Sequence, residues 1–188
     1  MSALLHAASC CFLLIDPRKE HLSQFDQETQ NALTRNFELL EQALRRVTVP
    51  IHIVFVSRTP EPDESLSKLE GASDARMHVS GSNGSFWSSS ALAATLGREP
   101  RRALVLAGFW LETTVTFTAL SALAAGFDVF IIMDATPPRT ADARSAAINR
   151  LLQAGGVPTT THQLIAEWTE TTSDLQERAA LSLLVSTH

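Results

Sequence analysis

Two short segments of the sequence carry side chains that could do chemistry. Asp16 directly follows an apolar run at residues 11–15, and Glu112, Thr113 and Thr114 follow a second apolar run at residues 103–107. A carboxylate at the carboxyl end of a buried strand can act as a general base or orient a ligand. A hydroxyl at the start of a helix lies beside free backbone N–H groups, which can stabilise an oxyanion.

Both segments also have a purely structural interpretation. Asp16 could hydrogen-bond the backbone of the loop that follows it, and position alone does not separate this role from a catalytic one. Threonine is a good helix N-cap and glutamate favours the first helical turn, so capping explains Glu112 to Thr114 when they are taken by themselves. None of these three residues is an obviously competent nucleophile.

The second segment belongs to a longer pattern. Residues 103–136 predict a strand, a sharp turn, a buried helix that ends at Gly126, and another strand at 129–133. This is one right-handed β-α-β crossover of a parallel sheet. A further buried strand at 51–56 ends in Ser57 and Arg58, which we expect at the same edge as Asp16.

The rest of the chain alternates in the same way. A long amphipathic helix is predicted between Asp26 and Val47, because apolar residues recur at spacings of three and four. Further predictions are a helix at 85–96, a helix after Thr140, one or two helices after residue 161, and edge strands near 77–79 and 157–161. The expected fold is a single domain, residues 1–188, of the α/β class. It is a three-layer α/β/α sandwich around a mostly parallel, Rossmann-like sheet of about six strands.

Composition limits the partners. With a net charge of −5 and a pI near 5.6, the chain lacks the clustered basic residues of a general nucleic-acid binder. No apolar run is long enough to suggest a membrane span. Cys10 and Cys11 are adjacent and lie in an apolar run, so we expect buried free thiols in a reducing compartment. A cytoplasmic location is predicted, and a mitochondrial one stays open.

Several common sites lack their signatures. The sequence has no phosphate-binding G-x-x-x-x-G-K-[ST] loop, no G-x-G-x-x-G after the first strand and no G-x-S-x-G elbow. The six histidines show no zinc-binding spacing, and His52 reads as a strand residue. Neither a cofactor nor a metal ion is expected.

A family resemblance sharpens the expectation. The segment AGFWLETTVTFTALSALAAGFDVFIIMDAT, residues 107–136, closely resembles the isochorismatase-like cysteine hydrolase family, in particular its bacterial branch of unknown substrate. The branch carries G-x-x-T-E-V-C-V, then P-A-L-S-A-x-x-x-G-[FY]-x-V-x-V-x-x-D-A. The apolar strand before Asp16, the segment NGSFW at 83–87 and the segment at 148–161 are also similar to the family. The matching residues of the central motif are Gly108, Glu112, Val115, residues 119–122, Gly126, Phe127, Val129, Asp134 and Ala135.

The resemblance implies a triad of aspartate, lysine and cysteine, in which the thiolate attacks an amide or related carbonyl. The aspartate falls on Asp16, but the cysteine position is Thr114. The chain's two lysines, at positions 19 and 68, do not fall where the family lysine would. The nearest substitutes in the sequence are Arg76 and His78.

The missing groups matter chemically. A threonine hydroxyl is far less acidic than a thiol and is β-branched, so it needs a strong adjacent base. The leading hypothesis is a homo-oligomeric pseudoenzyme of this hydrolase family, which binds a small molecule in a degenerate site. The predicted catalytic positions are Asp16 and Thr114, and the predicted ligand-binding residues are Arg76, His78, Trp87, Trp110 and Leu111.

Two alternatives stay open at this point. The chain could be an active hydrolase of a small amide or related substrate, using Thr114 as nucleophile or Asp16 to activate water. Some protozoan relatives are described as mitochondrion-associated ribonucleases, but the acidic charge gives that activity no independent support.

Overall fold

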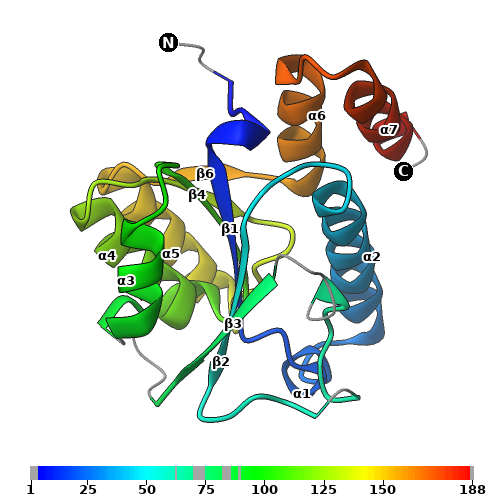
Figure 1. The fold of residues 1–188 in the computed structure, drawn as a ribbon. Coiled ribbons are helices and arrows are strands. Elements are labelled where there is room, and N and C mark those ends of the chain that lie inside the picture. Colours follow the sequence, from blue (N-terminus) through cyan, green and yellow to red (C-terminus); the bar gives the residue numbers. More distant parts are fainter. Residues whose placement is uncertain (1–3, 62, 70–74, 82–85, 89, 187–188) are drawn as a thin grey trace.

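A six-stranded, all-parallel sheet forms the centre of the protein (Figure 1). The structure is a computed structural model that describes residues 4–61, 63–69, 75–81, 86–88 and 90–186. The strand order is β3-β2-β1-β4-β5-β6. The strands are β1 (Cys10–Ile15), β2 (Ile51–Val56), β3 (Ala75–Ser80), β4 (Ala103–Gly108), β5 (Asp128–Ile132) and β6 (Val157–Thr159).

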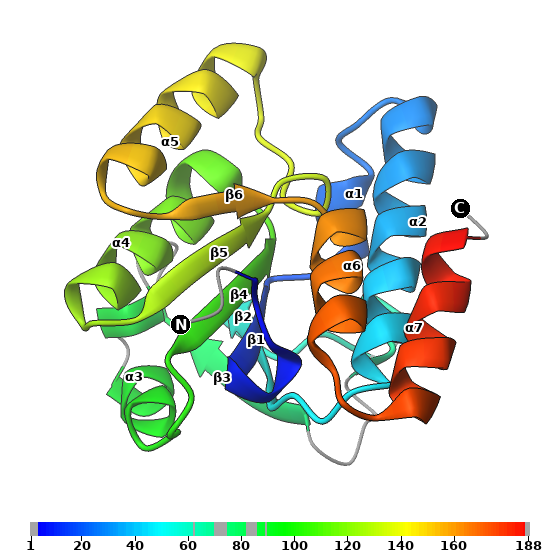
Figure 2. The same ribbon diagram turned by 90° about the horizontal axis from the view of Figure 1, so that it is seen from above.

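Helices cover both faces of the sheet. Figure 2 shows α2, α6 and α7 on one side and α3, α4 and α5 on the other. The helices are α1 (Lys19–Leu22), α2 (Gln27–Leu44), α3 (Ser90–Gly97), α4 (Thr116–Ala124), α5 (Ala141–Gln153), α6 (Thr161–Thr171) and α7 (Leu175–Ser186). Short turns are the 3₁₀ turns η1 (Ala7–Ser9) and η3 (Phe86–Ser88) and the π-helical turn η4 (Leu111–Val115). None of the described helices combines the length and apolar character needed to cross a bilayer.

Strand β1 shows why the sheet needs two helical layers. Cys10, Phe12 and Leu14 pack into the core under α2 and α6, whereas the alternate residues pack into a second core on the opposite face. All six residues of β1 are buried. A strand that is buried on both faces has a continuous apolar sequence, and such a run at residues 11–15 is the pattern that predicted this strand. The predicted α/β fold is confirmed, with a fully parallel sheet.

The strand order places a natural crevice between β1 and β4. The chain runs outward from β1 through β2 to β3, then returns to β4 and continues through β5 to β6. Ligands of open α/β sheets bind at the carboxyl ends of the strands where the order reverses. Gly108 lets the two strand ends approach, because its φ is +118° and an added Cβ would lie 2.0 Å from the Ile15 carbonyl oxygen. The edge thus brings the residue after Ile15 close to the segment after Gly108.

Three local predictions differ from the structure. The helix expected at 85–96 is two elements, η3 and α3, and residues 83–85 lie outside the described part of the chain. The last strand ends at Thr159, because Thr160 caps α6 by accepting a hydrogen bond from the Gln163 amide. The segment at Glu112 to Thr114 lies in the π-helical turn before α4, so these residues do not cap a regular α-helix.

Candidate functional site

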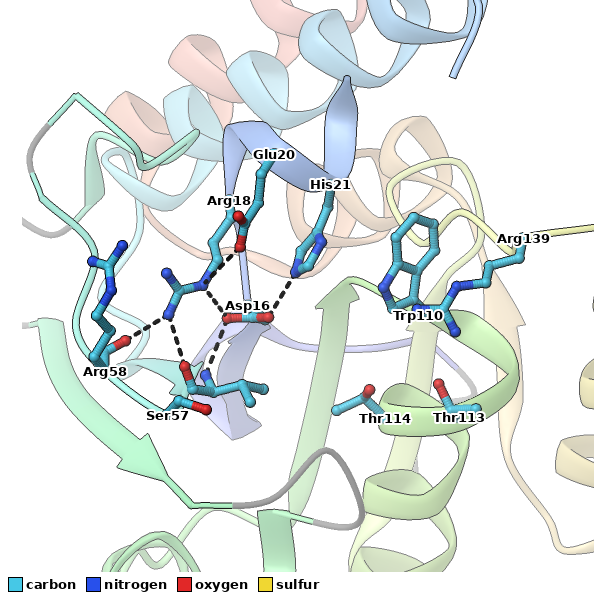
Figure 3. A pocket seen from close by; sticks show the side chains of 11 residues that line it. Asp16, Arg18, Glu20, His21, Ser57, Arg58, Trp110, Thr113, Thr114 and Arg139 are labelled. Atoms are coloured by element: carbon cyan, nitrogen blue, oxygen red, sulfur yellow. Dashed lines mark hydrogen bonds and ion pairs between the residues drawn. The ribbon is translucent and has the colours of Figure 1, made fainter. Parts of the chain in front are cut away.

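A cavity of about 660 Å³ opens at the carboxyl ends of β1, β2 and β4 (Figure 3). Its walls come from the loop and helix after β1, from the end of β2, from η4 and from the loop after β5. The lining residues are Asp16, Arg18, Glu20, His21, Val56, Ser57, Arg58, Trp110, Thr113, Thr114 and Arg139.

Asp16 lies at the floor of this cavity with its carboxylate hydrogen-bonded on both oxygens. Its Oδ1 accepts from the Arg18 Nε at 2.9 Å and from the Val56 amide at 3.1 Å. Its Oδ2 lies 2.7 Å from the His21 Nε2. The backbone of Asp16 has φ +46°, an uncommon conformation for a residue with a side chain, which turns the chain sharply out of β1. The side chain is almost completely buried.

Arg18 supplies the cation that the sequence analysis sought elsewhere. Besides Asp16, its guanidinium donates to the carbonyl oxygens of Val56 at 2.8 Å and of Arg58 at 2.5 Å. Only 5% of Arg18 is exposed. The guanidinium therefore links the loop after β1 to the end of β2. It also supplies the positive charge beside the Asp16 carboxylate.

This network controls the ionisation of Asp16. Burial raises the pKa of the Asp16 carboxyl. The hydrogen bonds from His21, Arg18 and the Val56 amide lower this pKa by more than burial raises it, so the net shift is downward. Asp16 is thus a stable carboxylate at neutral pH. A carboxylate with a depressed pKa is a poor proton acceptor.

His21 lines the cavity with one ring nitrogen held against Asp16. Its ring lies 5.4 Å from the Phe109 ring and 5.3 Å from the Trp110 ring, measured between centroids. Its Nδ1 is buried and has no hydrogen-bond partner in the described part of the chain. Since Nε2 faces Asp16, His21 supports the carboxylate and packs against aromatic rings.

Thr114 lines the cavity from η4, beside Thr113 and below Trp110 in Figure 3. The residue is 5% exposed. Among the described residues, no hydrogen bond joins Thr114 to Asp16 or to His21. A hydroxyl nucleophile needs a base within hydrogen-bonding reach, and among the described residues neither Asp16 nor His21 is hydrogen-bonded to Thr114.

The predicted site residues therefore divide into two groups. The cavity brings together Asp16, Trp110 and Thr114. The other four lie outside its lining, and each has its own packing or polar contact. Arg76 pairs with Glu99 at 3.1 Å, His78 contacts His52 at 3.2 Å, Trp87 packs edge-on against Phe127, and Leu111 is fully buried in the core.

The positions of Arg76 and His78 follow from strand order. Both lie on β3, the edge strand, and β2 separates that strand from β1. Arg76 pairs with Glu99, and His78 contacts His52 on the neighbouring strand β2, where burial lowers the pKa of His52 to about 4. The residues that the sequence analysis missed are Arg18, Glu20, His21 and Arg139. The first three follow Asp16 directly in the sequence, and that proximity was the available signal.

The two cysteines do not line this cavity. Burial raises the pKa of Cys10 to about 12 and that of Cys11 to about 11, and neither cysteine lines the cavity. A buried thiol of raised pKa is unreactive as a nucleophile. In the described part of the chain, no three His, Cys, Asp or Glu side chains are grouped closely enough to hold a metal ion.

Sequence comparison identifies one domain family and a partial relative. The isochorismatase domain profile matches residues 10–163 of this chain. A stretch of 55 residues is 44% identical to the probable hydrolase YcaC of Escherichia coli strain K12. That stretch covers 29% of this chain and 26% of the relative, so the match spans about a quarter of the length of that protein.

Solved structures share the complete fold. The E. coli YcaC structure, described as an octameric hydrolase of unknown specificity, has a TM-score of 0.84 and 24% identity over 100% of this chain and 92% of that one. YcaC from Pseudomonas aeruginosa, with hexane-2,5-diol and covalent acrylamide, has a TM-score of 0.82 and 22% identity over 96% and 91%. The MAR1 ribonuclease of Caenorhabditis elegans has a TM-score of 0.79 and 17% identity over 98% and 93%. Similarity at this level of identity establishes the fold and leaves activity open.

The buried ion pair makes a direct stability prediction. Asp16→Asn and Arg18→Met should each lower the free energy of unfolding by about 3 kcal/mol, because each leaves a buried partner without its counter-charge. The double variant should lose less unfolding free energy than the sum of the two single losses, with a coupling energy of about 1 kcal/mol or more. Urea denaturation followed by circular dichroism measures all three. Arg58→Met is the control, since its pair with Glu64 is half exposed and should matter little. Additive losses would contradict the coupling.

Proposed function

The chain belongs to the isochorismatase family, and we propose that it is a catalytically impaired member that binds a small ligand in the cavity beside Asp16. The observation that carries this proposal is the engagement of the Asp16 carboxylate by Arg18, His21 and the Val56 amide. The position where the family resemblance places the nucleophile is Thr114, and among the described residues no hydrogen bond joins Thr114 to Asp16 or His21.

Amide or ester hydrolysis needs an activated nucleophile and a base that takes its proton. The Oδ1 of Asp16 already accepts two hydrogen bonds, and the Oδ2 faces His21. Protonating this carboxylate would weaken its contact with the buried guanidinium of Arg18. The network therefore opposes the proton transfer that catalysis would require.

A second candidate, an active hydrolase, is favoured by one specific observation. A cation does lie next to Asp16, and Asp16 lines a cavity of about 660 Å³ that is large enough for a substrate and water. In this version Asp16 would orient or deprotonate a water molecule through Oδ2, and Thr113 or Thr114 would bind the substrate. The low pKa of Asp16 is the reason for ranking it second.

The ribonuclease alternative gains no support from the cavity. Three arginines line it, but Arg18 is paired with Asp16 and Arg58 with Glu64. Phosphate-backbone binding depends on several uncompensated cations. The similarity to the C. elegans enzyme concerns the fold.

We also propose that the chain forms a homo-oligomer. The E. coli relative is described as octameric. In this chain, both edges of the sheet expose apolar side chains: Met77 and Val79 on β3 are each about half exposed, and Val157 on β6 is 44% exposed. Exposed apolar residues gathered on an edge strand favour association. A cytoplasmic location stays a prediction from the two free cysteines.

The catalytic part is tested with a panel of small amides and esters. We expect no turnover above background by the wild-type chain, and no difference between it and Asp16→Asn. Product formation is followed by mass spectrometry, with circular dichroism confirming that each variant is folded. A turnover that Asp16→Asn reduces by about 10²-fold or more would contradict impairment and favour the active hydrolase.

Thr114→Cys is the matched variant for the same panel. It places a thiol near the end of η4, at the position of the Thr114 hydroxyl, and a thiol is far more acidic than a hydroxyl. Acrylamide should add once to this variant and leave the wild-type chain unmodified, since both native cysteines are buried. An adduct on the wild-type chain at Thr114 would overturn the proposal that position 114 is inert.

The oligomer is tested by light scattering coupled to size-exclusion chromatography. The expected mass is a multiple of the 20.4 kDa chain. Met77→Glu, which places a charge on the exposed edge of β3, should lower that mass, whereas Leu183→Glu on the exposed side of α7 serves as the control. A monomeric wild-type chain at micromolar concentration would refute the assembly.

A further inference from the structure

We propose that the ligand of this cavity carries a single carboxylate and that Arg139 is the residue that binds it. The inference rests on the proposed function, since it assumes that the cavity beside Asp16 binds a small molecule. It adds a chemical class of ligand and a specificity-determining residue.

Two of the three arginines that line the cavity already form hydrogen-bonded ion pairs within the protein. Arg18 is buried and donates hydrogen bonds to Asp16 and to two backbone carbonyl groups. Arg58 holds both oxygens of Glu64, at 2.7 and 2.9 Å, in a bidentate pair. Recruiting either guanidinium to a ligand would break existing charge-assisted hydrogen bonds.

Arg139 is different. In the described part of the chain its guanidinium makes no hydrogen bond to another residue, and its ion pair with Glu112 is long, at 4.0 Å between Nη1 and Oε1. The side chain is 53% exposed and lines the cavity. Its donors are therefore available to a ligand that enters from solvent.

Trp110 holds this guanidinium in place. The Arg139 Cζ lies 4.4 Å from the centre of the Trp110 ring, which is a close cation–π contact (Figure 3). Trp110 is itself buried and packed against His21 and Phe25. A planar guanidinium resting on a fixed ring loses little conformational freedom when it binds an anion, and its fork of donors matches a carboxylate.

The neighbouring hydroxyls add hydrogen-bond donors for a carboxylate. Thr113 and Thr114 lie on the same side of the cavity as Arg139, below Trp110 in Figure 3. A carboxylate has lone pairs for both the guanidinium and a hydroxyl. Thr114 would then serve as a ligand contact at the position where the family resemblance places a nucleophile.

The surrounding charges favour a monoanion. Asp16 and Glu20 also line the cavity, and Glu112 lies close to Arg139. One available cation can balance one negative charge, but a phosphate dianion would add repulsion from these carboxylates. An organic acid fits this balance better than a phosphorylated compound.

The test is a fluorine NMR titration with matched probes, 4-fluorobenzoate and 4-fluorobenzamide, which differ in charge but hardly in shape. We expect the acid to bind at least about tenfold more tightly than the amide. Arg139→Gln should weaken the binding of 4-fluorobenzoate by about tenfold and leave the affinity for 4-fluorobenzamide unchanged. Arg150→Gln, an exposed arginine on α5 outside the cavity lining, is the control and should change neither.

Each other outcome overturns the inference. Equal affinity for acid and amide, or an acid affinity unaffected by Arg139→Gln, removes the role of Arg139 while the cavity still binds a small molecule. Tighter competition by inorganic phosphate than by the acid would point to a dianion. Absence of acid binding up to roughly 10 mM would remove the carboxylate class. The proposed lack of catalysis fails separately, through turnover in the amide and ester panel.

Discussion

The buried ion pair between Asp16 and Arg18 is the contact on which the rest of the site depends. Asp16 turns the chain out of β1, and Arg18 returns from the next loop to bind both this carboxylate and the carbonyl groups at the end of β2. The pair fixes two adjacent strand ends relative to one another. Because a buried charge is costly without its partner, removing either side chain of the pair should lower stability.

This constraint links stability to function. A catalytic carboxylate must gain and lose a proton during turnover, whereas a structural carboxylate must stay charged. The hydrogen bonds from His21, Arg18 and the Val56 amide favour the charged form of Asp16 and so favour the structural role. Arg139, which rests on Trp110 at the same cavity, is the cation that we propose for ligand binding. These features support the proposal that the cavity recognises a ligand and does not transfer a proton.

The sequence predicts the scaffold well because the scaffold depends on regular patterns. Continuous apolar runs predict the buried strands, and the rule that parallel strands end at one edge brings Asp16 and Thr114 into the same cavity. Arg18 and His21 were missed because the loop after β1 follows no period, and because the positive φ of Asp16 cannot be read from its neighbours. Arg76 and His78 were chosen by sequence proximity to a family motif, but β3 lies at the sheet edge, with β2 between it and β1.

The most direct test of the central claim is the titration of the Asp16 carboxyl carbon by ¹³C NMR, assigned with Asp16→Asn. If the carboxylate is held in its charged form, its chemical shift should not change between about pH 5 and pH 8, and its pKa should lie below the ordinary value of about 4. A titration of this carbon near neutral pH would contradict the account, because it would identify Asp16 as a base poised for catalysis.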